Sequence, residues 1–344
     1  MLRIDSGDAG DDAVAPGGSR TPEITFTQLR YFVRSAELRS MSKAAVSLFV
    51  AQSAISTSIG NLERTLGTAL FVRHRAKGLS LTAEGVTYLA EVRGVLQALE
   101  EANLAIDPSR MAGSYEVGCF PTLVPFWMPS AMNDLRERYP DLHTKIREVR
   151  DDEIARRLLD RELEVVLAYD LTTHPQLDFV PIATAPPYAV VSVDHPLAAR
   201  GRVRLGELSE STPLILLDMA GSAQYFRRTL EAAGASTEPV HRLENYEAVR
   251  AMVARGHGYT LLNQRPRHDF TYDGYETRTL ALEPDLPSLH VGFMIRSSEP
   301  LTRKGAAFIR SCHTLAVELG QAVGTVPNLV RAARLDDLDT PASD

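Results

Sequence analysis

The segment 51–64 most constrains what this chain can fold into, because it reads as a short helix with two unlike faces. Ile55, Ile59 and Leu62 recur at helical spacing and would face a core. The opposite face holds small uncharged side chains that donate and accept hydrogen bonds: Gln52, Ser53, Ser56 and Thr57. Such side chains suit a helix that lies close against base edges in a DNA major groove. The segment therefore predicts a DNA-reading helix.

The flanking residues predict a helix-turn-helix followed by a wing. Apolar residues at helical spacing indicate one helix over 26–38 and another over 42–49, which the short link 50–51 joins to the polar-faced segment. Two short helices joined by a tight turn, with the second presented to DNA, form this motif. Residues 70–81 then read as a hairpin whose basic tip would contact phosphates through Arg73, Arg75 and Lys77.

The charge of this region agrees with binding to nucleic acid. Over residues 24–81, eight Lys and Arg residues stand against two acids, a net charge of +6, whereas the whole chain carries −7. The remaining residues therefore carry −13, so one basic module belongs to an otherwise acidic chain. Arg30, on the first helix, joins the residues expected to contact DNA. The alternative is an ordinary helical domain whose basic residues only meet solvent.

Several short motifs follow one another through this region. They include Phe26-Thr27-Gln28-Leu29-Arg30-Tyr31-Phe32, Ser42-Lys43-Ala44-Ala45, Gln52-Ser53-Ala54-Ile55-Ser56 and Leu81-Thr82-Ala83-Glu84-Gly85. In this order they closely resemble the N-terminal domain of LysR-type transcriptional regulators. The resemblance implies double-stranded promoter DNA and a small-molecule effector as partners. Ala51 departs from the pattern, since many members have Ser or Thr there, and the reading helix is expected to start without a side-chain cap.

The chain is expected to form an α+β multidomain protein. Residues 24–82 would be the winged helix-turn-helix DNA-binding domain, 83–108 a long linker helix, and 113–320 an effector-binding regulatory domain. The segments 1–23 and 326–344 are expected to be disordered tails.

In the regulatory domain, strand-like and helical runs alternate, which indicates α/β sheets. The resemblance implies two α/β subdomains arranged like those of a periplasmic solute-binding protein. The first would take 113–184 plus 291–320, and the second 185–290.

The linker helix carries an apolar stripe of nearly heptad spacing that includes Leu89, Val92, Leu96 and Leu99. A single helix between two domains has little of its own chain to cover that stripe, so pairing with a second copy is expected. The alternative is a helix packed on its own domain. The resemblance implies dimerisation through this helix and a homo-oligomer that is a dimer of dimers.

The expected effector site lies where strands end and helices begin in the regulatory domain. One side would hold Thr122 and Leu123, and the other the turn from Asp218 to Ser222 together with Asn263. Amide groups at helix N-termini favour an anionic effector, and the resemblance implies that the residue at Thr122 faces the effector. Thr122 could instead cap its helix, and Asn263 could form a turn.

The sequence lacks the usual motifs of cofactor binding and catalysis. No His and Cys cluster has zinc spacing, and Gly-rich phosphate loops and the nucleophile elbow are absent, so no metal, cofactor or catalytic residue is expected. Cys119 and Cys312 are expected to be buried thiols in a reducing cytoplasm. No apolar run approaches the length of a membrane span. The leading interpretation is a cytoplasmic, effector-responsive transcriptional regulator, and the alternatives are a solute-binding protein and an enzyme that uses the α/β cleft.

Overall fold

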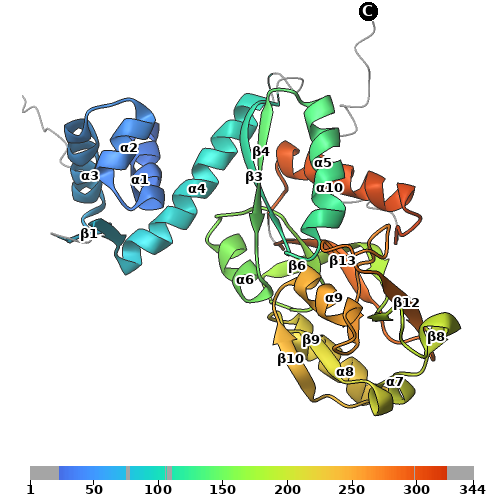
Figure 1. Ribbon diagram of the computed structural model, residues 1–344. Helices are drawn as coiled ribbons and strands as arrows, with labels where there is room; N and C mark the ends of the chain where they lie inside the picture. Colours follow the sequence, from blue (N-terminus) through green and yellow to red (C-terminus); the bar gives the residue numbers. More distant parts are fainter. Residues whose placement is uncertain (1–22, 75–77, 105, 107–110, 298, 324–344) are drawn as a thin grey trace, which may run out of the picture. The chain divides into compact units, whose positions relative to one another are not determined.

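The computed structural model describes residues 23–74, 78–104, 106, 111–297 and 299–323 (Figure 1). The chain divides into two compact units, Met1–Val92 and Arg93–Asp344. The two tails expected from the sequence lie outside the described residues, apart from Glu23.

The first unit consists of three helices and a two-stranded hairpin. The helices are α1 (Phe26–Leu38), α2 (Met41–Leu48) and α3 (Gln52–Leu66), and β1 (Phe71–His74) pairs antiparallel with β2 (Gly78–Leu81). Phe32, Ile55, Ile59 and Leu62 have no exposed surface, because the helical spacing puts them on the inner faces of α1 and α3. The predicted helix-turn-helix is therefore present, and α4 (Ala83–Leu104) follows the hairpin.

The starts of the three helices differ in how their free amides are satisfied. Thr25 and Gln28 form a reciprocal capping box at the start of α1, and Ser40 caps α2 through the amide of Lys43. Helix α3 begins at Ala51 without a side-chain cap, as expected from the sequence. Glu63 near the end of α3 accepts hydrogen bonds from the amides of Leu70 (2.8 Å) and Phe71 (3.1 Å), which fixes the hairpin against the helix.

The first subdomain of the second unit has a five-stranded sheet in the order β4-β3-β5-β13-β6. Strand β3 (Gly113–Cys119) runs parallel to β4 (Leu142–Glu148) and β5 (Val166–Tyr169), whereas β13 (Leu289–Arg296) lies antiparallel between β5 and β6 (Leu177–Ala185). Its helices are α5 (Val124–Arg138), α6 (Asp151–Leu159) and α10 (Arg303–Glu318). Helices α5 and α10 lie side by side, and Ser311 donates to Asp134 across them at 2.5 Å (Figure 1).

The second subdomain has a four-stranded sheet in the order β11-β7-β12-β8 and a parallel pair of β9 and β10. A parallel bridge from Leu214 to Tyr259 connects the pair to the larger sheet. These strands are β7 (Tyr188–Ser192), β8 (Arg202–Val203), β9 (Leu214–Leu217), β10 (Pro239–Leu243), β11 (Thr260–Leu262) and β12 (Thr277–Leu282). Its helices are α7 (Leu205–Ser211), α8 (Ser222–Ala232) and α9 (Tyr246–Ala254), with the short 3-10 turn Ala198–Arg200.

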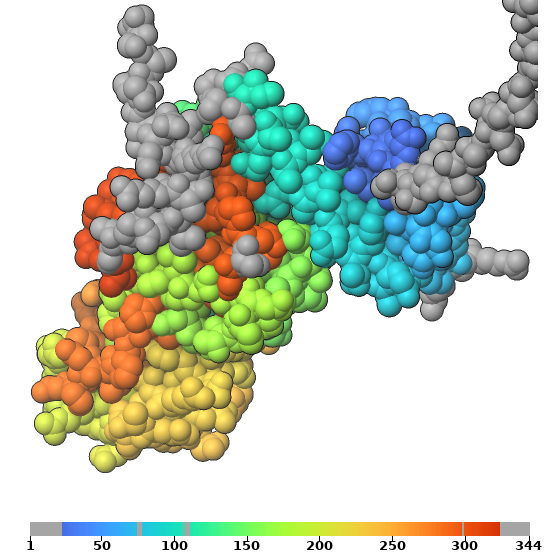
Figure 2. Space-filling view, turned by 180° about the vertical axis from the view of Figure 1, so that it is seen from behind, coloured from blue at the N-terminus to red at the C-terminus, as the bar shows by residue number. Residues whose placement is uncertain are grey.

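The chain passes twice between the two subdomains, once between β6 and β7 and once between β12 and β13. The first subdomain is therefore completed by segments that flank the second one in the sequence. In Figure 2 the yellow surface of the second subdomain adjoins the green surface of the first.

Among the described residues, no single helix is long and apolar enough to cross a membrane. The pair α2 and α3, bent by 114° at the turn, meets that test of length and composition only when taken together.

Candidate DNA-reading surface and ligand cavities

The polar face of α3 is open to solvent. Gln52, Ser53 and Thr57 are exposed and Ser56 is half-buried, opposite the buried Ile55. The structure thus presents the four predicted reading residues on one side of the helix, with the core on the other.

Further polar residues extend this face, and the sequence analysis missed them. Thr25, Gln28 and Asn61 join Ser53 and Thr57 around a shallow hollow on the surface. Asn61 lies one helical turn after Thr57, a spacing that could have signalled it.

Two of the four predicted phosphate contacts are open to solvent. Arg30 and Arg73 are exposed, and neither forms an ion pair with a described residue. Arg75 and Lys77 lie outside the described residues.

One expectation about the apolar stripe of the linker helix α4 needs correction. Leu89 and Val92 are only 8% and 2% exposed within the single chain, so the premise that their stripe lacks a partner there is wrong. The physical reason is that α4 packs on its own chain on either side of these two residues. The ring of Tyr88 lies 5.4 Å from that of Phe32, and Arg93 donates to the carbonyl of Asp160 at 2.8 Å.

Other members of the predicted apolar stripe stay more accessible. Val86 and Val95 are 48% and 47% exposed, and Leu96 and Leu99 are half-buried.

At the end of β3, Thr122 is buried and its hydroxyl lies 3.3 Å from that of Tyr169. Helix α5 has Leu123 as its N-cap and no side-chain cap, so Thr122 does not cap it. Leu123 itself is fully buried and its amide already bonds the carbonyl of Phe120 at 2.9 Å. In this arrangement neither the side chain nor the amide of Leu123 is free, so its contact with an effector stays a prediction.

Thr122, Tyr169, Ser222 and Tyr246 surround a cavity of about 10 Å³ between the subdomains. A space of this size holds at most one water molecule. An organic effector could enter here only after the subdomains had moved apart.

The turn before α8 meets a carboxylate of the first subdomain. A Cβ placed on Gly221, which has φ +79°, would lie 2.7 Å from Oδ2 of Asp151. Burial raises the pKa of the Asp151 carboxyl, while the hydroxyl of Thr172 donates to it and lowers the pKa. A carboxylate of the same chain therefore lies close to the N-terminus of α8, which is electropositive.

Asp218 and Asn263 are both engaged within the protein. Asp218 pairs with Arg242 at 3.5 Å and lines neither cavity, so its predicted ligand contact is not supported. Asn263 donates from Nδ2 to the carbonyl of Ala185 (2.8 Å) and to the hydroxyl of Tyr225 (3.1 Å). Asn263 therefore links the end of β11 to the first crossing through hydrogen bonds, and its role is not limited to forming a turn.

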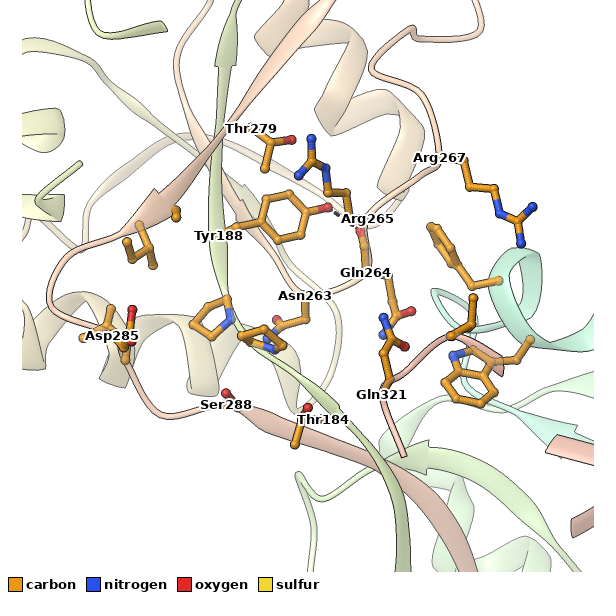
Figure 3. A pocket seen from close by; sticks show the side chains of 18 of the residues that line it. Thr184, Tyr188, Asn263, Gln264, Arg265, Arg267, Thr279, Asp285, Ser288 and Gln321 are labelled. Atoms are coloured by element: carbon orange, nitrogen blue, oxygen red, sulfur yellow. Dashed lines mark hydrogen bonds between the residues drawn. The ribbon is translucent and has the colours of Figure 1, made fainter. Parts of the chain in front are cut away.

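A larger cavity of about 670 Å³ lies beside the two crossings (Figure 3). Arg265 and Arg267, which follow β11, line it together with Gln264 and Tyr188. The sequence analysis missed this site, although two arginines within five residues of the end of a strand were a usable signal. Among the described residues, no group of three or more His, Cys, Asp or Glu could hold a metal ion.

Phenol groups position Gln264 between the two cavities. Its main-chain carbonyl accepts hydrogen bonds from the hydroxyls of Tyr188 and of Tyr246, the latter at 2.6 Å. Burial raises the pKa of Tyr246 to about 12 and that of Tyr188 well above its ordinary value, so both remain protonated donors.

Two domain families match this chain: the LysR substrate binding domain over residues 108–335, and the bacterial regulatory helix-turn-helix protein of the lysR family over residues 26–86. The chain belongs to the LysR family. It is a DNA-binding transcriptional regulator with a substrate-binding domain, and it is not an enzyme. The resemblance of the sequence motifs to LysR-type transcriptional regulators is confirmed.

Individual LysR proteins resemble this chain over most of its length. The C-terminal domain of a probable LysR regulator from Rhodococcus sp. RHA1 is 36% identical, with a TM-score of 0.56, and the match covers 59% of this chain and 99% of that one. HinK, a LysR regulator from Pseudomonas aeruginosa, is 29% identical, with a TM-score of 0.58 and coverage of 86% and 100%. The DNA-binding transcriptional dual regulator OxyR of Escherichia coli (strain K12) is 27% identical over 286 residues, 81% of this chain and 91% of that protein.

Proposed function

We propose that this LysR regulator reads its operator through Gln52, Ser53, Ser56 and Thr57, and that a small molecule bound between its regulatory subdomains changes DNA binding. The observation that carries the first part is the exposed polar face of α3, whose opposite face packs on the core. Phosphates of the same DNA would be bound by Arg30, Arg73, Arg75 and Lys77. The protein would act in the cytoplasm, where promoter DNA is found.

The test of base reading begins with an operator selected from a random DNA pool by the unaltered protein. Thr57→Ala should weaken binding to that operator by about 1–3 kcal/mol and leave binding to random DNA nearly unchanged. Thr65→Ala, the same substitution two turns further along α3, is the matched control. Equal losses on both DNAs, or no loss on either, would contradict the assignment.

For the effector, Thr122 and Ser222 supply buried hydroxyl-bearing side chains on the two sides of the interdomain contact. Binding there would favour a more open arrangement of the subdomains, since only a ligand with different affinities for two arrangements can shift their populations. A thermal-shift screen of metabolites on the full chain would identify the effector. Thr122→Val should then weaken the effector response while operator affinity without effector stays nearly intact.

Some relatives are named for a response to hydrogen peroxide, as in the hydrogen peroxide-inducible genes activator of Dickeya chrysanthemi. We do not propose a response to hydrogen peroxide for this chain. Its two cysteines, Cys119 and Cys312, are fully buried, and burial raises the pKa of both thiols. Peroxides oxidise exposed thiolates of low pKa, so the structure favours a bound small molecule as the signal.

A further inference from the structure

The 670 Å³ cavity beside the crossings has the size of a small-molecule site, which is typically about 300–1,000 Å³. Trp127 and Gln321 belong to the first subdomain, and Arg267 and Thr279 to the second, so the walls come from both. The cavity differs from the small space at Thr122, although Asn263 and Gln264 line both.

The charges of the lining residues favour an anion. Arg267 is exposed and forms no ion pair with a described residue, and the nearest carboxylate to Arg265 is that of Asp269, at 3.8 Å. Asp285 is the one acid among the described lining residues, and it is already paired with Arg202 at 2.8 Å. Figure 3 shows Asp285 on the side of the cavity away from Arg267. A guanidinium without a carboxylate partner is therefore left at one side.

Apolar groups line the same cavity and favour a flat, carbon-rich body. The rings of Phe126 and Trp127 come from α5, Pro186 and Pro187 from the first crossing, and Leu286 from the second. Aromatic and apolar walls with a few polar groups are the usual composition of a pocket for a small organic molecule.

We propose that this cavity binds an organic anion with an aromatic body, with its carboxylate toward Arg265 and Arg267 and its ring against the walls formed by α5 and the crossings. Bidentate pairing between guanidinium and carboxylate supplies orientation as well as affinity. The ligand would touch both subdomains and would therefore be sensitive to their relative arrangement. The proposal does not depend on effector binding at Thr122.

The experiment uses the purified full chain without DNA and the probe naphthalene-2-carboxylate, with the uncharged naphthalene-2-carboxamide as its matched partner. Trp127 is the single tryptophan of the chain and lies on the cavity wall, so its fluorescence reports on this site. The carboxylate should bind about tenfold more tightly than the amide, because a hydrogen bond between a guanidinium and a carboxylate is stronger than one to a neutral amide. It should also change the emission of Trp127, while calorimetry gives the affinities.

Variants separate this cavity from other places of binding. The double variant Arg265→Gln and Arg267→Gln should bind the carboxylate about tenfold more weakly and the amide as before. Arg228→Gln, at an exposed arginine of α8 that does not line the cavity, should change neither. Thr122→Val should bind the probe normally.

The proposal would be overturned by no binding of the carboxylate at millimolar concentration, by equal affinity for carboxylate and amide, or by unchanged affinity in the double arginine variant. If Thr122→Val alone abolished binding, the probe would occupy the smaller cavity and the proposal would be wrong. A failure of operator reading would appear only in DNA binding, so it would be distinguishable from each of these results.

Discussion

At the scale of single residues, the carbonyl of Gln264 is held by two phenol donors from different elements, Tyr188 on β7 and Tyr246 on α9. The same residue lines both interdomain cavities. The backbone of Gln264 is held in place by these hydrogen bonds. A movement of its side chain at one cavity would therefore also change the lining of the other.

We expect Tyr188→Phe and Tyr246→Phe each to cost about 1 kcal/mol of unfolding free energy, because the carbonyl keeps one donor in either variant. The double variant leaves that buried carbonyl without a donor and should cost more than the sum of the two. Urea unfolding of the three variants measures this coupling. Additive losses would mean that the two phenols act independently.

The cysteines permit a second residue-scale prediction. Because both thiols are buried and their pKa values are raised, neither Cys119 nor Cys312 should react with Ellman's reagent in the native protein. Both should react once the chain is unfolded in urea, which provides the control. Rapid labelling of one thiol in the native state would contradict the burial argument.

At the scale of elements, the start of α10 rests on a buried carboxylate. Glu164 accepts hydrogen bonds from the amide of Thr302 (2.5 Å), from its hydroxyl (2.6 Å) and from Tyr115 (2.8 Å). Thr302 in turn caps α10 through the amide of Gly305. A Cβ at position 305 would lie 2.7 Å from Oε2 of Glu164, which explains a glycine inside the first turn of a helix.

Glu164 should make stability depend on pH. Burial raises the pKa of its carboxyl in the folded state above the ordinary 4.5, so the folded chain binds this proton more tightly than the unfolded chain. Between 4.5 and the raised value, stability from this group is therefore lost as the pH rises. Relative to Glu164→Gln, the unaltered protein should gain unfolding free energy as the pH falls through that window. A difference between the two proteins that stays constant in urea unfolding across the window would contradict this.

Elements with a clear local signal could be predicted from the sequence, and those decided by tertiary packing could not. The reading helix was predictable because its apolar and polar residues alternate at helical spacing over four turns. Strand β6 has a weaker local signal because it contains Pro181. The proline is tolerated because the pairing with β13 is irregular there: Val291 pairs with Ala183 and Gly292 with Pro181, which leaves Ile182 of β6 as an extra residue.

The candidate sites were predictable to a smaller degree. The polar face of α3 could be predicted because its residues belong to one helix. Whether Leu89, Leu123 or Asp218 is accessible depends on the residues that pack against each of them, and no local sequence pattern shows this. The larger cavity combines α5, both crossings and the residues after β11, so it exists only in the folded arrangement.

At the scale of the whole molecule, we propose a dimer of dimers in which α4 pairs through the side that the single chain leaves open. Val95 and Leu99, four residues apart, lie on that side. Val95→Glu should dissociate the pair, because the contact would bury an unpartnered charge. Light scattering measures the mass.

The matched control is Val240→Glu, which makes the same change at an exposed valine of β10. It should leave the mass unchanged. Leu89→Glu differs from both, because Leu89 is buried in the single chain and its loss should lower the unfolding free energy itself. An intact oligomer in Val95→Glu would exclude this side of α4 as the interface.

The position of β13 has a consequence for the order in which the protein can be made. This strand fills the space between β5 and β6, yet it is synthesised after the entire second subdomain. During translation, the whole second subdomain therefore leaves the ribosome while the sheet of the first still lacks its interior strand β13. During that interval β5 and β6 each have an edge whose backbone hydrogen-bonding groups are unpaired. Such edges can pair with the wrong strand or bind a chaperone.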